Sequence, residues 1–212
     1  MEEQSKKEIQ VSKSTVDSLV FFTFGATLDE EYLLYAVIKK AFFDATNQGA
    51  FNTLVGKVDD HIKADAKKDA IMSLYEEIQK YNTPKGEKFN AWHKSVCEKV
   101  RSPYKKEMED EFSHGNAQKL VNMTIKYLYL LSGIADHYEI NSSIKEILTA
   151  IKADSKYLHV PIDSYIIDAI WNQSDDDAKK KLPGKTDEER RKNRNSLNTQ
   201  REYKRPSDNL LG

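Results

Sequence analysis

Apolar positions recur at helical spacing through most of the chain. Between residues 27 and 46 they form two neighbouring rows of one helix face: Leu33, Val37 and Ala41, then Leu34, Ile38 and Phe42. The same spacing predicts helices at residues 51–62, 66–81, 89–100, 116–131, 142–151 and 161–171. The pattern therefore predicts an all-α fold, a compact multi-helix domain.

Short polar motifs predict where these helices begin and end. Thr27 and Glu30 have the spacing of a capping box, so a helix is expected to start at Thr27. Residues 82–86, NTPKG, break the chain between two helices, and Ser102 with Pro103 is expected to open a further short helix. The apolar run LVFFTF at residues 19–24 fits a strand or a buried helical turn equally well.

Composition divides the chain at about residue 174. We expect a helical domain over residues 1–174 and a charged, flexible tail over residues 175–212. From Lys185 to the end, eight basic residues stand against five acidic ones, a net charge of +3. Such a segment is either a solvated tail or a contact for the DNA backbone.

Composition also excludes several classes of protein. The 212 residues carry 33 Lys and Arg against 34 Asp and Glu, a net charge of −1, which neither indicates nor excludes a nucleic-acid binder. The single cysteine, Cys97, cannot form an internal disulfide or a thiolate zinc site. No apolar run approaches the ~18 residues of a membrane span, and the N-terminus is polar, so we expect a cytoplasmic protein without membrane contact.

Familiar metal and nucleophile motifs are missing. No HExxH, His-Asp dipeptide, GxxxxGK[ST], GxGxxG or GxSxG occurs in the sequence. Cys97 follows His93 by four residues, so both fall on one helix face. We interpret the pair as a small buried residue beside a surface imidazole.

The first informative segment is residues 114–128. Gly115 precedes the predicted helix, where the chain is expected to turn tightly. Lys119, Asn122 and Lys126 then line one stripe of that helix. A lysine in the first turn opposes the helix dipole, which favours the neutral, nucleophilic amine. Alternatively, Lys119 simply extends from a half-buried helix into solvent.

The second informative segment is residues 158–167, LHVPIDSYII. Pro161 suits the first turn of a helix, and there the helix dipole keeps the carboxylate of Asp163 ionised. Alternatively, Asp163 is an N-terminal charge that stabilises a core helix.

Together the two segments resemble the helix-hairpin-helix DNA glycosylases. Gly115-Asn116-Ala117-Gln118-Lys119 resembles the Gly-x-Gly-x-Lys hairpin of that superfamily, and Val160-Pro161-Ile162-Asp163 resembles its Val-Pro-Val-Asp motif. The Gln118-Lys119 pair and the long spacing to Asp163 are most similar to the 8-oxoguanine glycosylases, particularly their archaeal branch. Two departures stand out: Ala117 replaces the second hairpin glycine, and residues 133–157 form an insertion of about twenty residues between the motifs.

The resemblance implies an enzyme that excises a modified or damaged base from DNA, with or without lyase activity. The small size of the chain is compatible with DNA repair and with excision of modified bases in phage DNA. By carry-over, Lys119 is the Schiff-base nucleophile and Asp163 the catalytic carboxylate, and neither a metal nor an organic cofactor is required. Candidates for binding the flipped base are Trp92, Phe89, Trp171 and His159. Candidates for binding DNA are Gly115, Asn116, Gln118, Asn122 and Lys126.

Two alternatives from other classes stay open. In the first, the protein is a non-catalytic helical module that binds DNA or a protein partner, and Lys119 and Asp163 form a surface ion pair. In the second, it is a metal-dependent helical hydrolase built on His114, Asp136, His137 and His159.

Overall fold

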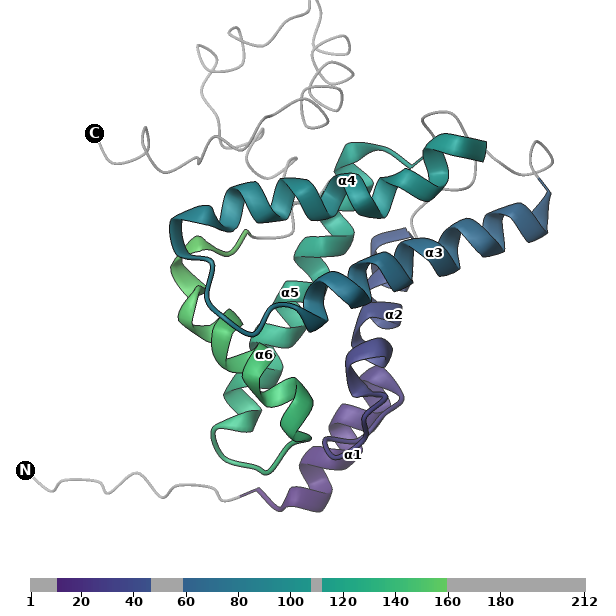
Figure 1. Cartoon of the computed structure of the whole chain (residues 1–212). Helices are drawn as coiled ribbons and strands as arrows, with labels where there is room; N and C mark the ends of the chain where they lie inside the picture. Colours follow the sequence, from purple (N-terminus) through teal and green to yellow (C-terminus); the bar gives the residue numbers. More distant parts are fainter. Residues whose placement is uncertain (1–10, 47–58, 108–111, 160–212) are drawn as a thin grey trace, which may run out of the picture.

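The computed structural model describes residues 11–46, 59–107 and 112–159, and every regular element in these ranges is helical (Figure 1). The elements are α1 (Lys13–Phe24), α2 (Leu33–Thr46), α3 (Asp60–Gln79), η2 (Gly86–Lys88), α4 (Phe89–Glu107), α5 (His114–Ala135), α6 (Ser142–Ala153) and η3 (Ser155–Tyr157). The predicted all-α fold is confirmed. No helix of this part of the chain is long and apolar enough to cross a membrane.

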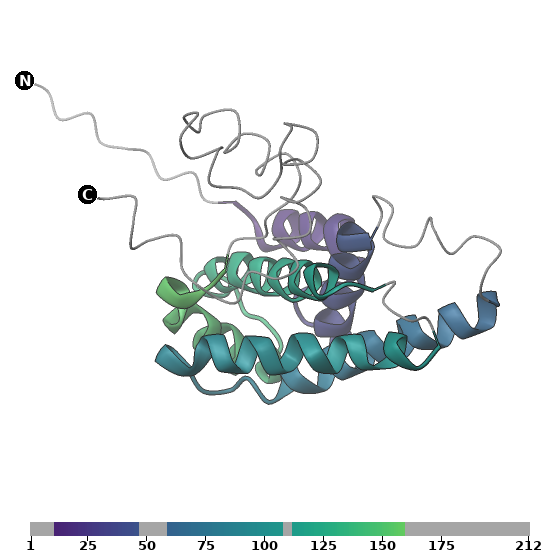
Figure 2. The same ribbon diagram turned by 90° about the horizontal axis from the view of Figure 1, so that it is seen from above.

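The central element is α5, which packs against α2, α4 and α6. Figure 2 shows α3 and α4 side by side along one side of α5, with α1 on the opposite side. Apolar side chains cover most of the circumference of α5, and its fully buried members include Leu120, Val121, Ile125, Leu128 and Leu131. Because α2, α4 and α6 pack around this helix, most of its side chains serve the core, and its few polar side chains are the candidates for a functional role.

Polar caps fix the helix ends. The side chains of Ser12, Asp59, Ser113 and Asn141 each accept a hydrogen bond from a backbone N–H of the first turn that follows. Gly25 ends α1 in the left-handed conformation, at a φ of 79°, and its N–H donates to the carbonyl oxygen of Phe21.

The predicted capping box at Thr27 is wrong. Residues 19–24 belong to α1, and the next helix begins only at Leu33. Thr27 and Glu30 instead form a turn, in which the Glu30 N–H donates to the Thr27 carbonyl oxygen over 3.3 Å. The reason is tertiary: Leu28 is fully buried, Asp17 accepts its N–H, and its carbonyl oxygen accepts from the Asn141 N–H.

Two further helix boundaries differ from the prediction. Residues 66–81 were expected as a separate helix, but α3 already starts at Asp60, while residues 47–58 lie outside the described residues. Pro103 does not open a new helix, since α4 continues through it to Glu107. The turn after Pro103 is held by Tyr104, which is buried and stacks on Phe112 at 4.4 Å between ring centroids.

The stretch at residues 133–157 is part of the core rather than an added insertion. It supplies the end of α5, all of α6 and η3, and α6 packs along α5. Its buried apolar residues are Ile140, Ile144, Ile147, Leu148, Ala150 and Ile151. The predicted helix at 161–171, the boundary at 174 and the tail all lie outside the described residues.

A buried carboxylate joins the α3–α4 connection to the end of α6. Asp154 is 1% exposed, and it accepts hydrogen bonds from the Tyr81 hydroxyl, the Lys85 N–H (2.6 Å) and the Gly86 N–H (2.8 Å). Burial, together with the bond to this carboxylate, raises the pKa of Tyr81. This bridge fixes where the chain leaves α6 on its way to His159.

Replacing Asp154 with alanine should lower the free energy of unfolding by about 2–4 kcal/mol, because three donors lose their acceptor. Urea denaturation followed by circular dichroism measures this loss. Tyr81→Phe is the matched control, since it removes one of the three bonds and should cost about 1 kcal/mol. Equal losses in the two variants would show that the backbone N–H groups contribute nothing to the bridge.

Candidate functional site

The face of α5 that carries Lys119 is the starting point of the candidate site. Ser113 caps the helix, so Lys119 lies in its second turn rather than in the first turn that we expected. The helix dipole acts mainly within the first turn, so the electrostatic argument for an activated amine does not apply at this position. Lys119 is half-buried and Lys126 is exposed, and neither forms an ion pair with a described residue.

The predicted hairpin glycine is a helical residue. Gly115 lies within the first turn of α5, and the glycines with positive φ in the described residues are Gly25 and Gly86. The tight turn expected at Gly115 is therefore wrong, because Ser113 already starts the helix. The N–H of Asn116 donates to the Ser113 side chain over 3.1 Å, so it is engaged in capping. Gln118 is half-buried on the same helix.

A hydrogen-bonded chain lies one turn beyond Lys119. The side-chain amide oxygen Oδ1 of Asn122 lies 2.7 Å from Nε2 of His93, and Nδ1 of His93 lies 3.8 Å from Sγ of Cys97. An amide oxygen only accepts, so this arrangement assigns the ring hydrogen to Nε2 and makes Nδ1 the acceptor for the thiol. Asn122 is 8% exposed, so its amide serves the interior and does not face a phosphate.

His93 is a buried, neutral imidazole. Burial, together with the nearby His159, lowers its pKa to about 3, although the hydrogen bond with Asn122 acts in the opposite direction. His93 and Cys97 do share a face of α4, as expected, but the surface location predicted for the imidazole is wrong. The spacing in the sequence could have predicted that His93 is buried, because His93 follows Phe89 by four residues and shares a helix face with Val96 and Val100.

Three of the predicted base-binding residues meet around this histidine. His159 lies 4.6 Å from His93 and 5.3 Å from Phe89 between ring centroids, and Phe89 lies 5.5 Å from Trp92. We call Phe89, Trp92, His93 and His159 the aromatic cluster. Nε2 of His159 also lies 2.9 Å from the side-chain amide oxygen Oδ1 of Asn90.

The aromatic cluster is packed more tightly than an open stacking platform would be. Phe89 is 1% exposed, so both faces of its ring are covered, whereas Trp92 and His159 keep part of their surface. A flipped base would therefore have to stack on the latter pair. Trp171, the fourth candidate, and Asp163 lie outside the described residues.

The four residues of the hydrolase alternative are not gathered at one place. His114 and Asp136 flank a helix of 22 residues, which separates them by about 33 Å. His114 lies 3.2 Å from Glu98, and Asp136 pairs with Lys152, which lowers the pKa of the Asp136 carboxyl. His159 belongs to the aromatic cluster. These four positions do not form one metal site, and the described residues hold no group of three or more His, Cys, Asp or Glu side chains that could bind a metal ion.

In comparisons with known proteins, no protein-family model, curated protein or solved structure matches this chain.

Proposed function

We propose that the protein is a DNA glycosylase, with Lys119 as an amine nucleophile and Asp163 as its catalytic carboxylate. One observation carries the proposal: the α5 face of Lys119 leads, through Asn122 and His93, directly to His159. Lys119 precedes Asn122 by one turn, about 4.5 Å along the helix axis.

Chain length supports a common location for the two residues. Four residues of fully extended chain span at most about 14 Å, so Asp163 cannot lie further than that from His159. His159 in turn contacts His93, which is hydrogen-bonded to Asn122. This short link to His159 supports the proposal that the two motifs act together, although 43 residues separate Lys119 from Asp163.

The proposed reaction uses side chains alone. The target nucleotide leaves the duplex, because its sugar cannot be reached inside the base stack. The bond between base and sugar breaks, the base departs with the electron pair, and the Asp163 carboxylate stabilises the cationic sugar. The Lys119 amine bonds to the anomeric carbon and passes a proton to Asp163. The bond from the anomeric carbon to the ring oxygen then breaks, the ring oxygen takes up the proton held by Asp163, and the nitrogen electron pair forms the Schiff base, which opens a route to strand cleavage.

The charge of the α5 face is compatible with DNA. Lys119 and Lys126 point from the same side of α5, about 10 Å apart along its axis, and neither is neutralised by a described carboxylate. An unpaired ammonium group such as that of Lys126 can hold a backbone phosphate while the Lys119 amine faces the sugar.

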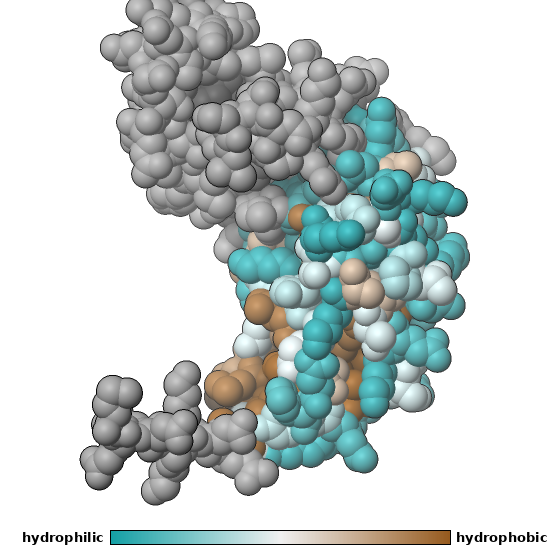
Figure 3. All heavy atoms as spheres, turned by 90° about the vertical axis from the view of Figure 1, so that its left-hand side faces the viewer, coloured by the Kyte–Doolittle hydropathy of each residue, from teal (hydrophilic) through white to brown (hydrophobic). Residues whose placement is uncertain are grey.

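A second candidate function is favoured by the surface of α1. Its outward face exposes Leu19, Phe21 and Phe22, and Phe22 is 87% exposed. Figure 3 shows apolar side chains gathered on the lower part of the molecule, beside the start of the N-terminal trace. Exposed apolar faces mark contact sites, so a non-catalytic module that binds a protein partner is the competing hypothesis.

The experiment that tests the proposal is release of free bases. Full-length protein is incubated with diverse DNAs, including heavily modified phage genomes, and the released bases are identified by mass spectrometry. We expect one class of modified base to appear in solution in proportion to enzyme concentration. Absence of any released base across these DNAs would favour the non-catalytic module.

A further inference from the structure

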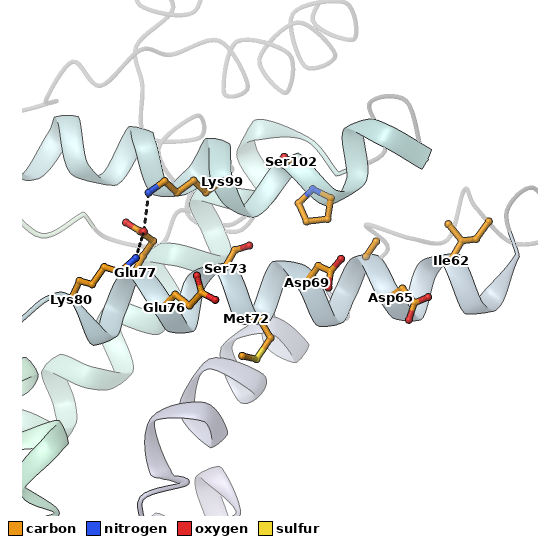
Figure 4. A pocket seen from close by; sticks show the side chains of 12 residues that line it. Ile62, Asp65, Asp69, Met72, Ser73, Glu76, Glu77, Lys80, Lys99 and Ser102 are labelled. Atoms are coloured by element: carbon orange, nitrogen blue, oxygen red, sulfur yellow. Dashed lines mark hydrogen bonds and ion pairs between the residues drawn. The ribbon is translucent and has the colours of Figure 1, made fainter.

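The groove between α3 and α4 is acidic and unoccupied by any described residue. Its volume is about 900 Å³, and its wall carries four carboxylates against two ammonium groups: Asp65, Asp69, Glu76 and Glu77, then Lys80 and Lys99. Figure 4 shows these side chains along α3, with Lys99 reaching across from α4. Such a wall repels DNA phosphates, so the occupant of this groove is not the DNA that we propose for the α5 face.

The charges of the groove are separated along its length. At one end Glu77 binds both Lys99, at 2.8 Å, and Lys80, at 3.3 Å. Partial burial raises the pKa of Glu77, but these two bonds outweigh it and lower the pKa overall. The rest of the groove carries carboxylates without such partners.

Those carboxylates are Asp65, Asp69 and Glu76, which form no ion pair or hydrogen bond with a described residue. Met72 lies among them with 37% of its surface exposed, and Pro103 lines the groove from α4. The groove therefore runs from an end that carries Lys80 and Lys99 to an acidic end, with Met72 and Pro103 among its lining residues. An occupant of complementary charge carries acidic residues at the end with Lys80 and Lys99, and basic residues at the end with Asp65.

We infer that residues 187–194 of this same chain dock in the α3–α4 groove. Their sequence, DEERRKNR, has three acidic residues followed by four basic ones. Laid from the Lys80 end toward Asp65, the acidic block meets Lys80 and Lys99, and the basic block meets the three unpaired carboxylates. The groove spans 15 residues of α3 between Asp65 and Lys80, about 22 Å, and eight extended residues span about 26 Å.

The part of the chain that follows the described residues is long enough to reach the α3–α4 groove. It leaves the described residues at His159, beside Asn90 in the first turn of α4. Lys99 lies nine residues further along α4, about 14 Å away. The 27 residues from 160 to 186 span up to about 90 Å when extended, so length does not prevent docking. Under the proposed function, docking withdraws these basic residues from DNA, but docking itself does not depend on that function.

The test is a paramagnetic label next to the basic block in the full-length protein. A nitroxide is attached at Ser196→Cys, and buried Cys97 stays unlabelled, as mass spectrometry verifies. We expect amide NMR signals along α3 from Ile62 to Glu76 to lose intensity. The loss should disappear in about 1 M salt, where the screening length falls to ~3 Å.

Two triple variants separate specific docking from net charge. Asp65→Asn, Asp69→Asn and Glu76→Gln together should abolish the intensity loss. Glu30→Gln, Glu31→Gln and Glu139→Gln change the net charge equally at exposed positions outside the groove, and should leave the loss intact. Equal effects of both variants, or no loss in the parent protein, would overturn the inference. A loss seen only between labelled and isotope-enriched molecules in a mixture would also overturn it, in favour of a second copy.

Discussion

Replacing Lys119 with alanine is expected to abolish covalent trapping of DNA. With an amine nucleophile, borohydride reduces the Schiff base to a stable protein–DNA adduct, which denaturing electrophoresis detects. DNA with an abasic site is the best substrate, because the adduct then forms without prior release of a base. The side chain of Lys119 is half-buried and makes no ion pair with a described residue, so its loss should leave the fold intact.

Lys126→Ala is the matched control for this experiment. Lys126 lies on the same face of α5, two turns further along, and is also without a described ion-pair partner. We expect this variant to bind DNA more weakly but to form the adduct at saturating protein. An undiminished adduct in Lys119→Ala, with circular dichroism unchanged, would assign the nucleophile to another amine.

Replacing Asp163 with asparagine should slow base release by about 10²- to 10⁴-fold while DNA binding persists. The neutral amide keeps the shape of the side chain but removes the charge, which matters most when the sugar becomes cationic. The rate is measured in single turnovers at saturating protein, and binding is measured separately by fluorescence anisotropy.

Asp168→Asn serves as the comparison, because it makes the same change five residues later in the sequence. A specific role for Asp163 requires that this second variant releases the base at nearly the parental rate. If both variants are slowed equally, the carboxylates stabilise the segment rather than the reaction.

Periodicity located α2, α4, α5 and α6, because each carries an apolar face within its own sequence. It left α1 undecided and placed the start of α3 too late. It failed where distant contacts decide the backbone. The backbone of Leu28 is hydrogen-bonded to Asp17 and Asn141 and therefore does not adopt the predicted helix. These two contacts join positions that are distant in the sequence, so no local pattern predicts them. Pro103 is a helix breaker by its own chemistry, yet α4 continues through it to Tyr104, which packs on Phe112.

The candidate site was predictable in part. Phe89, Trp92 and His159 were selected as separate aromatic or histidine positions, and the structure brings them together around His93. Asn122 was expected on the same stripe as Lys119, but its bond to His93 joins residues 29 positions apart on two helices. A pairing at that separation depends on how α4 packs on α5, which sequence periodicity does not determine.

The Asp154 bridge has a consequence for the order in which the protein assembles. The α3–α4 and α5–α6 pairs are neighbours in sequence and can form by local collision. The Tyr81–Asp154 bond joins residues 73 positions apart, so it must close a much longer loop, at a greater entropic cost. We therefore expect this bond to form after the helix pairs during folding. His159, which follows the bridge by five residues, then acquires its position beside His93 only when the rest of the core is complete.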